Sequence, residues 1–146
     1  MFFRGLPHVH CLIWLAEPVH LDQMDKIVSA EIPDRQKDPL LYEIIVKNNM
    51  HGPCGEKCME NGKCSKNFPK PFCAETQSAS DGYPAYRRRS PQDGGHTFEI
   101  RRDDRVVTMT NAWVVPYSPF LSRTFQCHIN LELCYSVKSI QYVCKV

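Results

Sequence analysis

The sequence lacks any apolar run of membrane-spanning length. A spanning helix needs about 20 consecutive apolar residues, whereas the longest such run, residues 9–16, is short and contains His10. The first five residues also lack the apolar core and the small-residue cleavage site of a secretory signal peptide. We therefore expect an intracellular protein with no membrane partner, whose 8 cysteines are thiols or metal ligands.

Excess charge of either sign is also missing. The chain has 18 lysines and arginines against 16 aspartates and glutamates, a formal net charge of +2. Bulk charge therefore does not attract nucleic acid, and any DNA contact must come from local clusters. Apolar residues at 42% and charged residues at 23% are ordinary for a globular domain and argue against wholesale disorder.

Both ends lack the signals that bound an intact domain. Residue 6 already lies in a strand-like segment, and the last segment reaches Val146 without a cap or stop signal. We therefore expect that residues 1–146 are part of a longer domain.

The hydrophobic pattern predicts an α+β fold. Apolar runs and alternation predict strands over residues 6–15, 97–100, 106–110 and 128–134. Helical stripes predict helices over residues 21–30, 39–49 and 136–146, the second capped by Asp38 with Pro39 at its first position. This order predicts a mixed, largely antiparallel sheet with packed helices. Three parts follow from it: residues 1–50, an irregular Cys- and Lys-rich insertion over 51–95, and residues 96–146.

Two histidines in the first predicted strand form a candidate metal site. His8 and His10 are two residues apart, so both imidazoles point to one side of a strand. Neutral imidazoles placed in this way can chelate one divalent cation and leave positions for a third ligand, water and substrate oxygens. The alternative is a pair of half-buried histidines with no ligand role.

The third metal ligand is expected on the strand over residues 128–134. His128, Asn130 and Glu132 alternate onto one face of that strand. Glu132 is the first choice and His128 the second, because oxygen ligands suit Mg²⁺ or Mn²⁺. The alternative is a polar strand face exposed to solvent or to the loop.

A tyrosine near the end of the chain is the candidate nucleophile. On a helix, Lys138, Tyr142 and Lys145 lie on one face. Nearby lysine charge lowers the pKa of a phenol, ordinarily about 10, and a metal ion stabilises the charge that develops on a phosphate under attack. The alternative is a tyrosine whose ring packs in the core.

A cluster of cysteines and one histidine predicts a structural zinc ion in the insertion. The compact set is His51, Cys54, Cys58 and Cys64, in a stretch without a core of its own. The spacing is not the paired Cys-x-x-Cys of well-known zinc modules, so thiols in a loop are the alternative.

Several motifs in one order resemble the Rep domain of Helitron-type transposases, members of the HUH endonuclease superfamily. The first is Arg-Gly-Leu-Pro-His-Val-His-Cys-Leu-Ile-Trp-Leu at residues 4–15. The others are His-Gly-Pro-Cys at 51–54, Gly-Lys-Cys-Ser-Lys-Asn-Phe-Pro-Lys-Pro-Phe at 62–72, Trp-Val-Val-Pro-Tyr at 113–117 and Cys-His-Ile-Asn-Leu-Glu at 127–132. The resemblance runs over nearly the whole chain.

The resemblance implies rolling-circle transposition in the nucleus, with metal-dependent nicking of single-stranded DNA and a covalent phosphotyrosine. His8 and His10 match the family's histidine pair, and Tyr142 matches the first tyrosine of Tyr-x-x-x-Tyr, with Lys145 beside it. The second tyrosine position is Val146. The strands expected before Gly5 and the fused helicase that normally follows are absent, so the resemblance implies a truncated, impaired copy. A non-catalytic DNA-binding remnant and a small zinc-stabilised interaction module are the alternatives.

Two basic clusters are candidate contacts for single-stranded DNA. Lysines interleave with Phe68 and Phe72, and arginines follow Tyr83 and Tyr86, so that cations for phosphates stand beside aromatic platforms for bases. The basic residues are Lys63, Lys66, Lys70, Arg87, Arg88 and Arg89. The alternative is a solvated charged surface.

Overall fold

The computed structural model describes residues 8–17, 19–52, 58–78, 84–102 and 104–134, which form a mixed α+β arrangement. The α-helices in these ranges are α1 (Leu21–Ile27), α2 (Pro39–Asn48) and α3 (Pro119–Phe125). Two short 3₁₀ turns are η2 (Pro91–Asp93) and η3 (Asn111–Trp113). The strands are β1 (His8–Ile13), β2 (Met59–Glu60), β3 (Lys63–Cys64), β4 (Gln77–Ser78), β5 (Pro84–Ala85), β6 (Phe98–Arg102), β7 (Arg105–Met109) and β8 (His128–Leu133).

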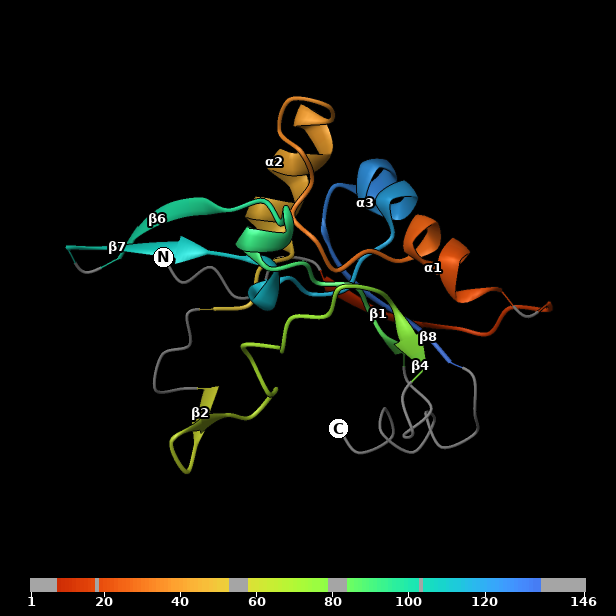
Figure 1. Cartoon of the computed structure of the whole chain (residues 1–146), viewed down its shortest axis with the longest axis horizontal. Coiled ribbons are helices and arrows are strands. Elements are labelled where there is room, and N and C mark those ends of the chain that lie inside the picture. Colours follow the sequence, from red (N-terminus) through yellow and green to blue (C-terminus); the bar gives the residue numbers. More distant parts are fainter. Residues whose placement is uncertain (1–7, 18, 53–57, 79–83, 103, 135–146) are drawn as a thin grey trace.

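The described strands pair two by two. β1 and β8 are parallel, whereas β2–β3, β4–β5 and β6–β7 are antiparallel ribbons. The α+β class is confirmed, but these strands do not form the single mixed sheet that the sequence predicts. The β6–β7 ribbon extends away from the other elements (Figure 1); Phe98 and Met109, which pair with each other, are partly or fully buried, whereas most of its other side chains are exposed.

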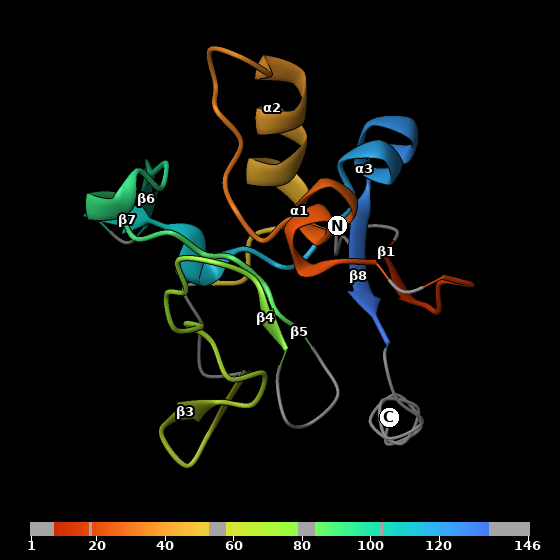
Figure 2. The same ribbon diagram turned by 45° about the vertical axis from the view of Figure 1, so that its right-hand side comes forward.

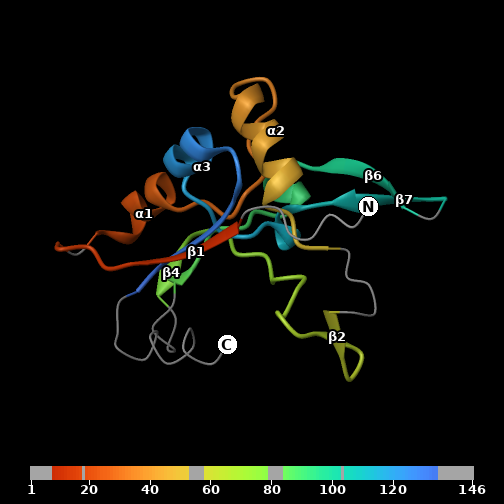
Figure 3. The ribbon, with the colours of Figure 1, turned by 180° about the vertical axis from the view of Figure 1, so that it is seen from behind.

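One apolar cluster lies against the β1–β8 pair. Figures 1 and 3 show α1 and α3 on one side of these strands. Leu131 and Leu133 of β8 are buried there against Met24 and Val28, and Cys11 and Ile13 of β1 pack at the margin. Because side chains alternate along a strand, the opposite face of the pair is left to polar residues.

A second apolar cluster lies beneath α2. Leu41, Ile44 and Ile45 of this helix pack on Val114 and Tyr117. The hydroxyl of Tyr117 donates to the backbone carbonyl of Glu31 at 2.8 Å, and burial raises the pKa of this phenol. Tyr117 therefore joins the segment after α1 to the segment before α3.

Local sequence signals account for most helix boundaries. The prediction for α2 is confirmed: Pro39 is its first residue, and the Asp38 carboxylate accepts from the backbone N–H of Leu41. The helix that begins at Leu21 ends at Ile27, before the predicted Ala30, because Ser29 exchanges two backbone hydrogen bonds with Tyr117. The predicted helix over residues 136–146 lies outside the described residues.

Candidate metal site and DNA-contact surface

The parallel register of β1 and β8 brings three imidazoles together. His8 pairs with His128, and His10 pairs with Asn130, so all four side chains lie on the polar face. The ring centroids are 5.7 Å apart for His8 and His10, 6.2 Å for His8 and His128, and 6.4 Å for His10 and His128. His8 and His10 are exposed and His128 is partly exposed, so a ligand from solvent can reach all three rings.

These spacings are close to those of a metal site. Three imidazoles on one tetrahedral metal, with metal–nitrogen distances of about 2.1 Å, would have their centroids about 5 Å apart. The observed centroids are slightly wider, and no group of three or more His, Cys, Asp or Glu side chains within the described ranges is close enough to hold a metal ion as it stands.

The Nδ1 atoms of His128 and His10 each have a polar partner that orients the ring. Nδ1 of His128 lies 2.6 Å from the carbonyl oxygen of Asn48, which can only accept, so Nδ1 donates and the lone pair of a neutral ring would be on Nε2. A backbone carbonyl in this position is a common second partner of a metal-ligating histidine. The amide nitrogen of Asn130 lies 3.2 Å from Nδ1 of His10. The buried amide oxygen of Asn130 has no hydrogen-bond partner among the described atoms.

The surroundings of His10 favour its neutral form. Burial lowers its pKa from the ordinary value of 6.5, and the charges of Lys66, His128 and His8 lower it further. A neutral imidazole has the lone pair that a metal ion requires. The neutral form of His10 is therefore favoured, with its Nδ1 facing the amide nitrogen of Asn130.

The two candidates for the third ligand occupy different surroundings. The ring of His128 lies beside His8 and His10, whereas Glu132 pairs in register with Leu12, further along the strand. The negative charge of Glu132 acts on Lys70 and Arg88. The geometry therefore favours His128 over Glu132, the reverse of the order expected from the sequence.

The predicted lysines lie along one segment beside the histidine face. Lys66 is exposed, and its positive charge lowers the pKa of both His10 and His51. Lys70 is partly buried and lies 5.3 Å over the ring of Phe68, and burial lowers its pKa. Lys63 is exposed on β3.

Lys63 and the ring of Phe68 line a shallow pocket of about 570 Å³. Phe68 and Trp113 form part of its wall, and the other lining residues are Met59, Gly62, Cys64, Asn67 and Pro69. Aromatic rings beside cations are the components of a single-strand binding surface.

The three predicted arginines all have partners within the fold. Arg88 is only 5% exposed, and its guanidinium donates to the backbone carbonyls of Asn111 and Val114. Burial lowers its pKa to about 10. Arg87 and Arg89 form ion pairs with Glu31, and Arg87 also pairs with Asp25. A run of cations beside tyrosines gives no sign in the sequence of the buried carboxylate of Glu31, with which Arg87 and Arg89 pair.

The structure brings together part of the predicted zinc set. Nε2 of His51 lies 3.2 Å from Sγ of Cys64, and Cys58 immediately precedes β2 of the hairpin that contains Cys64. Cys54 lies outside the described residues. Tyr142, Lys145 and Val146 lie outside them as well, so their predicted roles stay predictions.

Sequence reasoning did not assign a role to two residues that support the imidazoles. Asn130 alternates with His128 on the polar face of β8, and this periodicity placed it there without indicating its contact with His10. Asn48 contributes only its backbone carbonyl, at the end of α2. A main-chain contact between residues 80 apart leaves no local signal in the sequence.

Comparisons with known proteins found no match for this chain. No family model matches the chain, and no curated protein matches it either. Within the part of the chain that the structure describes, no helix has the length and apolar character needed to cross a membrane.

Proposed function

We propose that the chain is part of a Helitron-type Rep domain whose chemistry is metal-dependent nicking of single-stranded DNA. The observation that supports this most strongly is the cluster of His8, His10 and His128 on one exposed strand face. The resemblance of residues 4–15 to the family signature identifies the same His-x-His pair. The HUH-like character of the fold, the nuclear location and the fused helicase partner belong to this proposal.

In the proposed site, the three imidazoles hold the cation and the lysines bind the DNA strand. Mn²⁺ or Mg²⁺, when bound, would supply positive charge that stabilises a phosphate under attack. His128 is held in the ligating orientation by the carbonyl of Asn48. Lys66, whose charge reaches His10, is positioned to contact a backbone phosphate next to the imidazoles.

The proposed reaction transfers one strand of DNA to Tyr142. The phenol loses its proton, its oxygen forms a bond to phosphorus, and the bond from phosphorus to the leaving deoxyribose oxygen breaks. That oxygen takes up a proton to become a free hydroxyl. Because the second tyrosine position is Val146, a subsequent strand transfer that needs a second phenol is lost, and the copy is impaired.

A second candidate function is binding of single-stranded DNA without cleavage. Lys63, which lines the pocket with Phe68 and Trp113, and the exposed Lys66 favour it, because this surface does not depend on the metal or the tyrosine.

The experiment that separates these functions is incubation of the whole chain with a mixed-sequence pool of single-stranded oligonucleotides and Mn²⁺. We expect a covalent protein–DNA adduct on a denaturing gel. The adduct should disappear in Tyr142→Phe and in His10→Ala, and it should persist in Tyr42→Phe, whose tyrosine lies on α2 against Phe98. Absence of adduct with the unchanged chain, when binding is retained, would leave only the second function.

The proposed DNA-contact surface, which contains Lys63 and Lys66, predicts a change in the salt dependence of DNA binding. Lys66→Ala should weaken binding of single-stranded oligonucleotide and make the slope of log affinity against log salt shallower by about 0.7, the value for one phosphate contact. Lys47→Ala removes the same charge from an exposed position on α2 and should leave the slope unchanged. Fluorescence anisotropy over a salt series measures both, and equal slopes for the two variants would remove Lys66 from the surface.

A further inference from the structure

The β2–β3 hairpin has almost no apolar core of its own. Asn61 and Gly62 both have left-handed backbone conformations, with φ of 51° and 77°, which suits a two-residue hairpin turn. Each strand is only two residues long, and Cys64 is the one buried residue of the two strands. An isolated two-stranded hairpin is marginally stable at best in water. Figure 2 shows β3 on the far side of the molecule from α2 and α3, so these helices do not cover it.

The side chain of Cys64 in this hairpin contacts the imidazole of His51. Nε2 of His51 lies 3.2 Å from Sγ of Cys64. Two ligands on one tetrahedral zinc ion, with zinc–nitrogen near 2.1 Å and zinc–sulfur near 2.3 Å, would lie about 3.5 Å apart. The pair is therefore at nearly the spacing that a shared zinc ion requires.

Cys64 and His51 each have further partners in this part of the fold. Sγ of Cys64 accepts from the backbone N–H of Lys66 at 3.4 Å. Cys64 also interacts electrostatically with Lys70. His51 is fixed from two sides: its backbone N–H donates to the carbonyl of Trp113, and its ring stacks on Phe68 at 4.2 Å.

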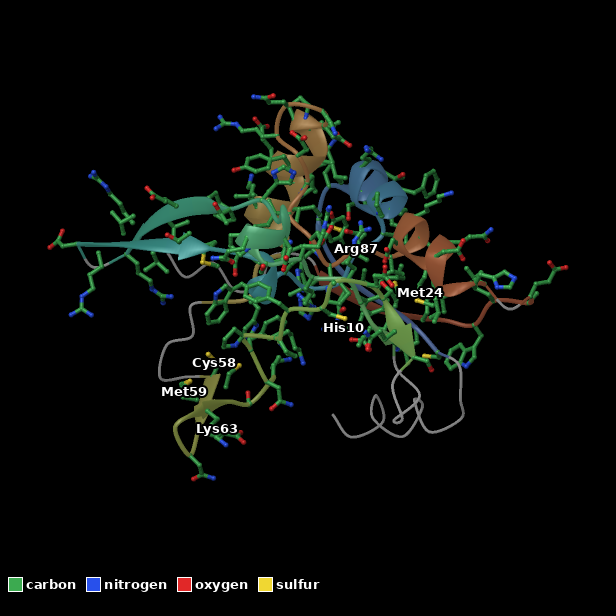
Figure 4. The ribbon with its side chains drawn as sticks, viewed as in Figure 1. His10, Met24, Cys58, Met59, Lys63 and Arg87 are labelled. Atoms are coloured by element: carbon green, nitrogen blue, oxygen red, sulfur yellow. The ribbon has the colours of Figure 1, made fainter. Side chains whose placement is uncertain are left out.

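Cys58 immediately precedes strand β2 of the same hairpin, so its backbone lies beside the segment of Cys64. Its backbone carbonyl accepts from the N–H of Ser65, the residue after Cys64, at 2.9 Å. Figure 4 shows Cys58 beside Met59 in this hairpin, well away from His10. The hairpin ladder thus holds Cys58 next to the segment that carries Cys64.

We propose that His51, Cys58 and Cys64 bind a structural zinc ion that holds the β2–β3 hairpin against Phe68 and Trp113. This site is separate from the histidine face of β1 and β8 and does not depend on nuclease activity. The hairpin lacks an apolar core, and the free energy of zinc binding would stabilise its folded conformation instead. The ion would also set the position of Lys63 and Lys66.

Metal analysis of the purified whole chain tests the proposal, and we expect about one equivalent of zinc. After replacement by Co²⁺, thiolate coordination should give a charge-transfer band in the near ultraviolet, which an all-histidine site cannot produce. His51→Ala and Cys64→Ser should lose the band. His10→Ala should keep it, so this test and the test of the nuclease can fail separately.

Cys73→Ser is the matched control for loss of a thiol. Cys73 donates to the carbonyl of Glu75 at 2.7 Å and pairs through its backbone with Arg88, away from the proposed site. The control should keep the zinc ion and the cobalt band. If the unchanged chain contains less than half an equivalent of zinc, or if Cys64→Ser keeps the band, the proposal is overturned.

A measurement on the unchanged chain covers the case in which the variants do not fold. Chelation should release zinc and increase the number of thiols that react with a thiol-specific reagent. An unchanged thiol count after complete chelation would contradict the proposal.

Discussion

Replacing Glu31 with alanine is expected to lower the free energy of unfolding by about 3 kcal/mol, the low end for breaking a buried ion pair. Glu31 is only 6% exposed. Its carboxylate accepts from the side chain of Arg89 at 2.7 Å and from the backbone N–H of Arg89 at 2.8 Å, and it pairs with Arg87 at 3.3 Å. Without it, a backbone donor is left unsatisfied, whereas the partly exposed guanidinium groups can be rehydrated.

Urea unfolding measures this loss as a lower midpoint at constant slope. Glu43→Ala is the control, because Glu43 is exposed on α2 and its loss should shift the midpoint little. A shift in Glu31→Ala no larger than that of Glu43→Ala would show that the arginine cluster does not hold the fold together.

The same carboxylate predicts how stability depends on pH. Burial alone would raise the pKa of Glu31, but hydrogen bonds from Arg89 and the charges of Arg87 and Arg89 outweigh burial, so the pKa lies below the ordinary 4.5. Its stabilising contribution is therefore complete above about pH 4.5 and is lost as the pH falls through the lowered value. Glu31→Gln should flatten this acid limb of the stability profile, and an unchanged limb would contradict the assignment.

Replacing His128 with alanine is expected to weaken Mn²⁺ binding by at least about tenfold. The ring of His128 lies within 6.4 Å of both other imidazoles, and the carbonyl of Asn48 holds it in a ligating orientation. Glu132→Gln is the matched comparison, because it keeps the shape of the other candidate ligand and removes its charge. We expect it to change the affinity little, since Glu132 already balances the charges of Lys70 and Arg88.

Isothermal titration with Mn²⁺ and Mg²⁺ separates the two possibilities. An imidazole set should bind Mn²⁺ better than Mg²⁺, because Mg²⁺ prefers oxygen ligands. A large loss in Glu132→Gln together with no loss in His128→Ala would restore the carboxylate as the third ligand.

Features with a local cause were predictable from the sequence. The Asp38–Pro39 pair predicted the start of α2, and alternation predicted β8 and its polar face. Period-2 geometry alone placed His8 and His10 on one side of β1. Each of these inferences uses residues that are neighbours in the chain, and local structure follows from them without knowledge of the rest of the fold.

Helix α3 had a local signal that the sequence reading missed. Ser118 caps it by accepting from the N–H of Leu121, and Pro119 is its first residue, as in α2. The helix is short, and Phe120 and Phe125 are 73% and 62% exposed, so it lacks the apolar stripe that identified α2. Capping residues without such a stripe predict a helix only weakly.

Features that depend on distant residues could not be predicted. The parallel register that joins His8 to His128 spans nearly the whole chain, and the partnership of Arg89 with Glu31 spans 58 residues. Sequence periodicity identifies which face of a strand is polar, but it does not identify the strand that lies beside it. For this reason the sequence could not show that His128 lies beside His8 and His10, or that Arg87 and Arg89 pair with Glu31.

The most direct test of the histidine site counts the nitrogen ligands of a bound ion. Pulsed electron paramagnetic resonance of the whole chain loaded with Mn²⁺ detects magnetic coupling to each coordinated imidazole. We predict couplings from three imidazoles, one of which disappears in each of His8→Ala, His10→Ala and His128→Ala. A spectrum without nitrogen coupling would mean that these rings do not share a metal ion, and the nuclease proposal would lose its support.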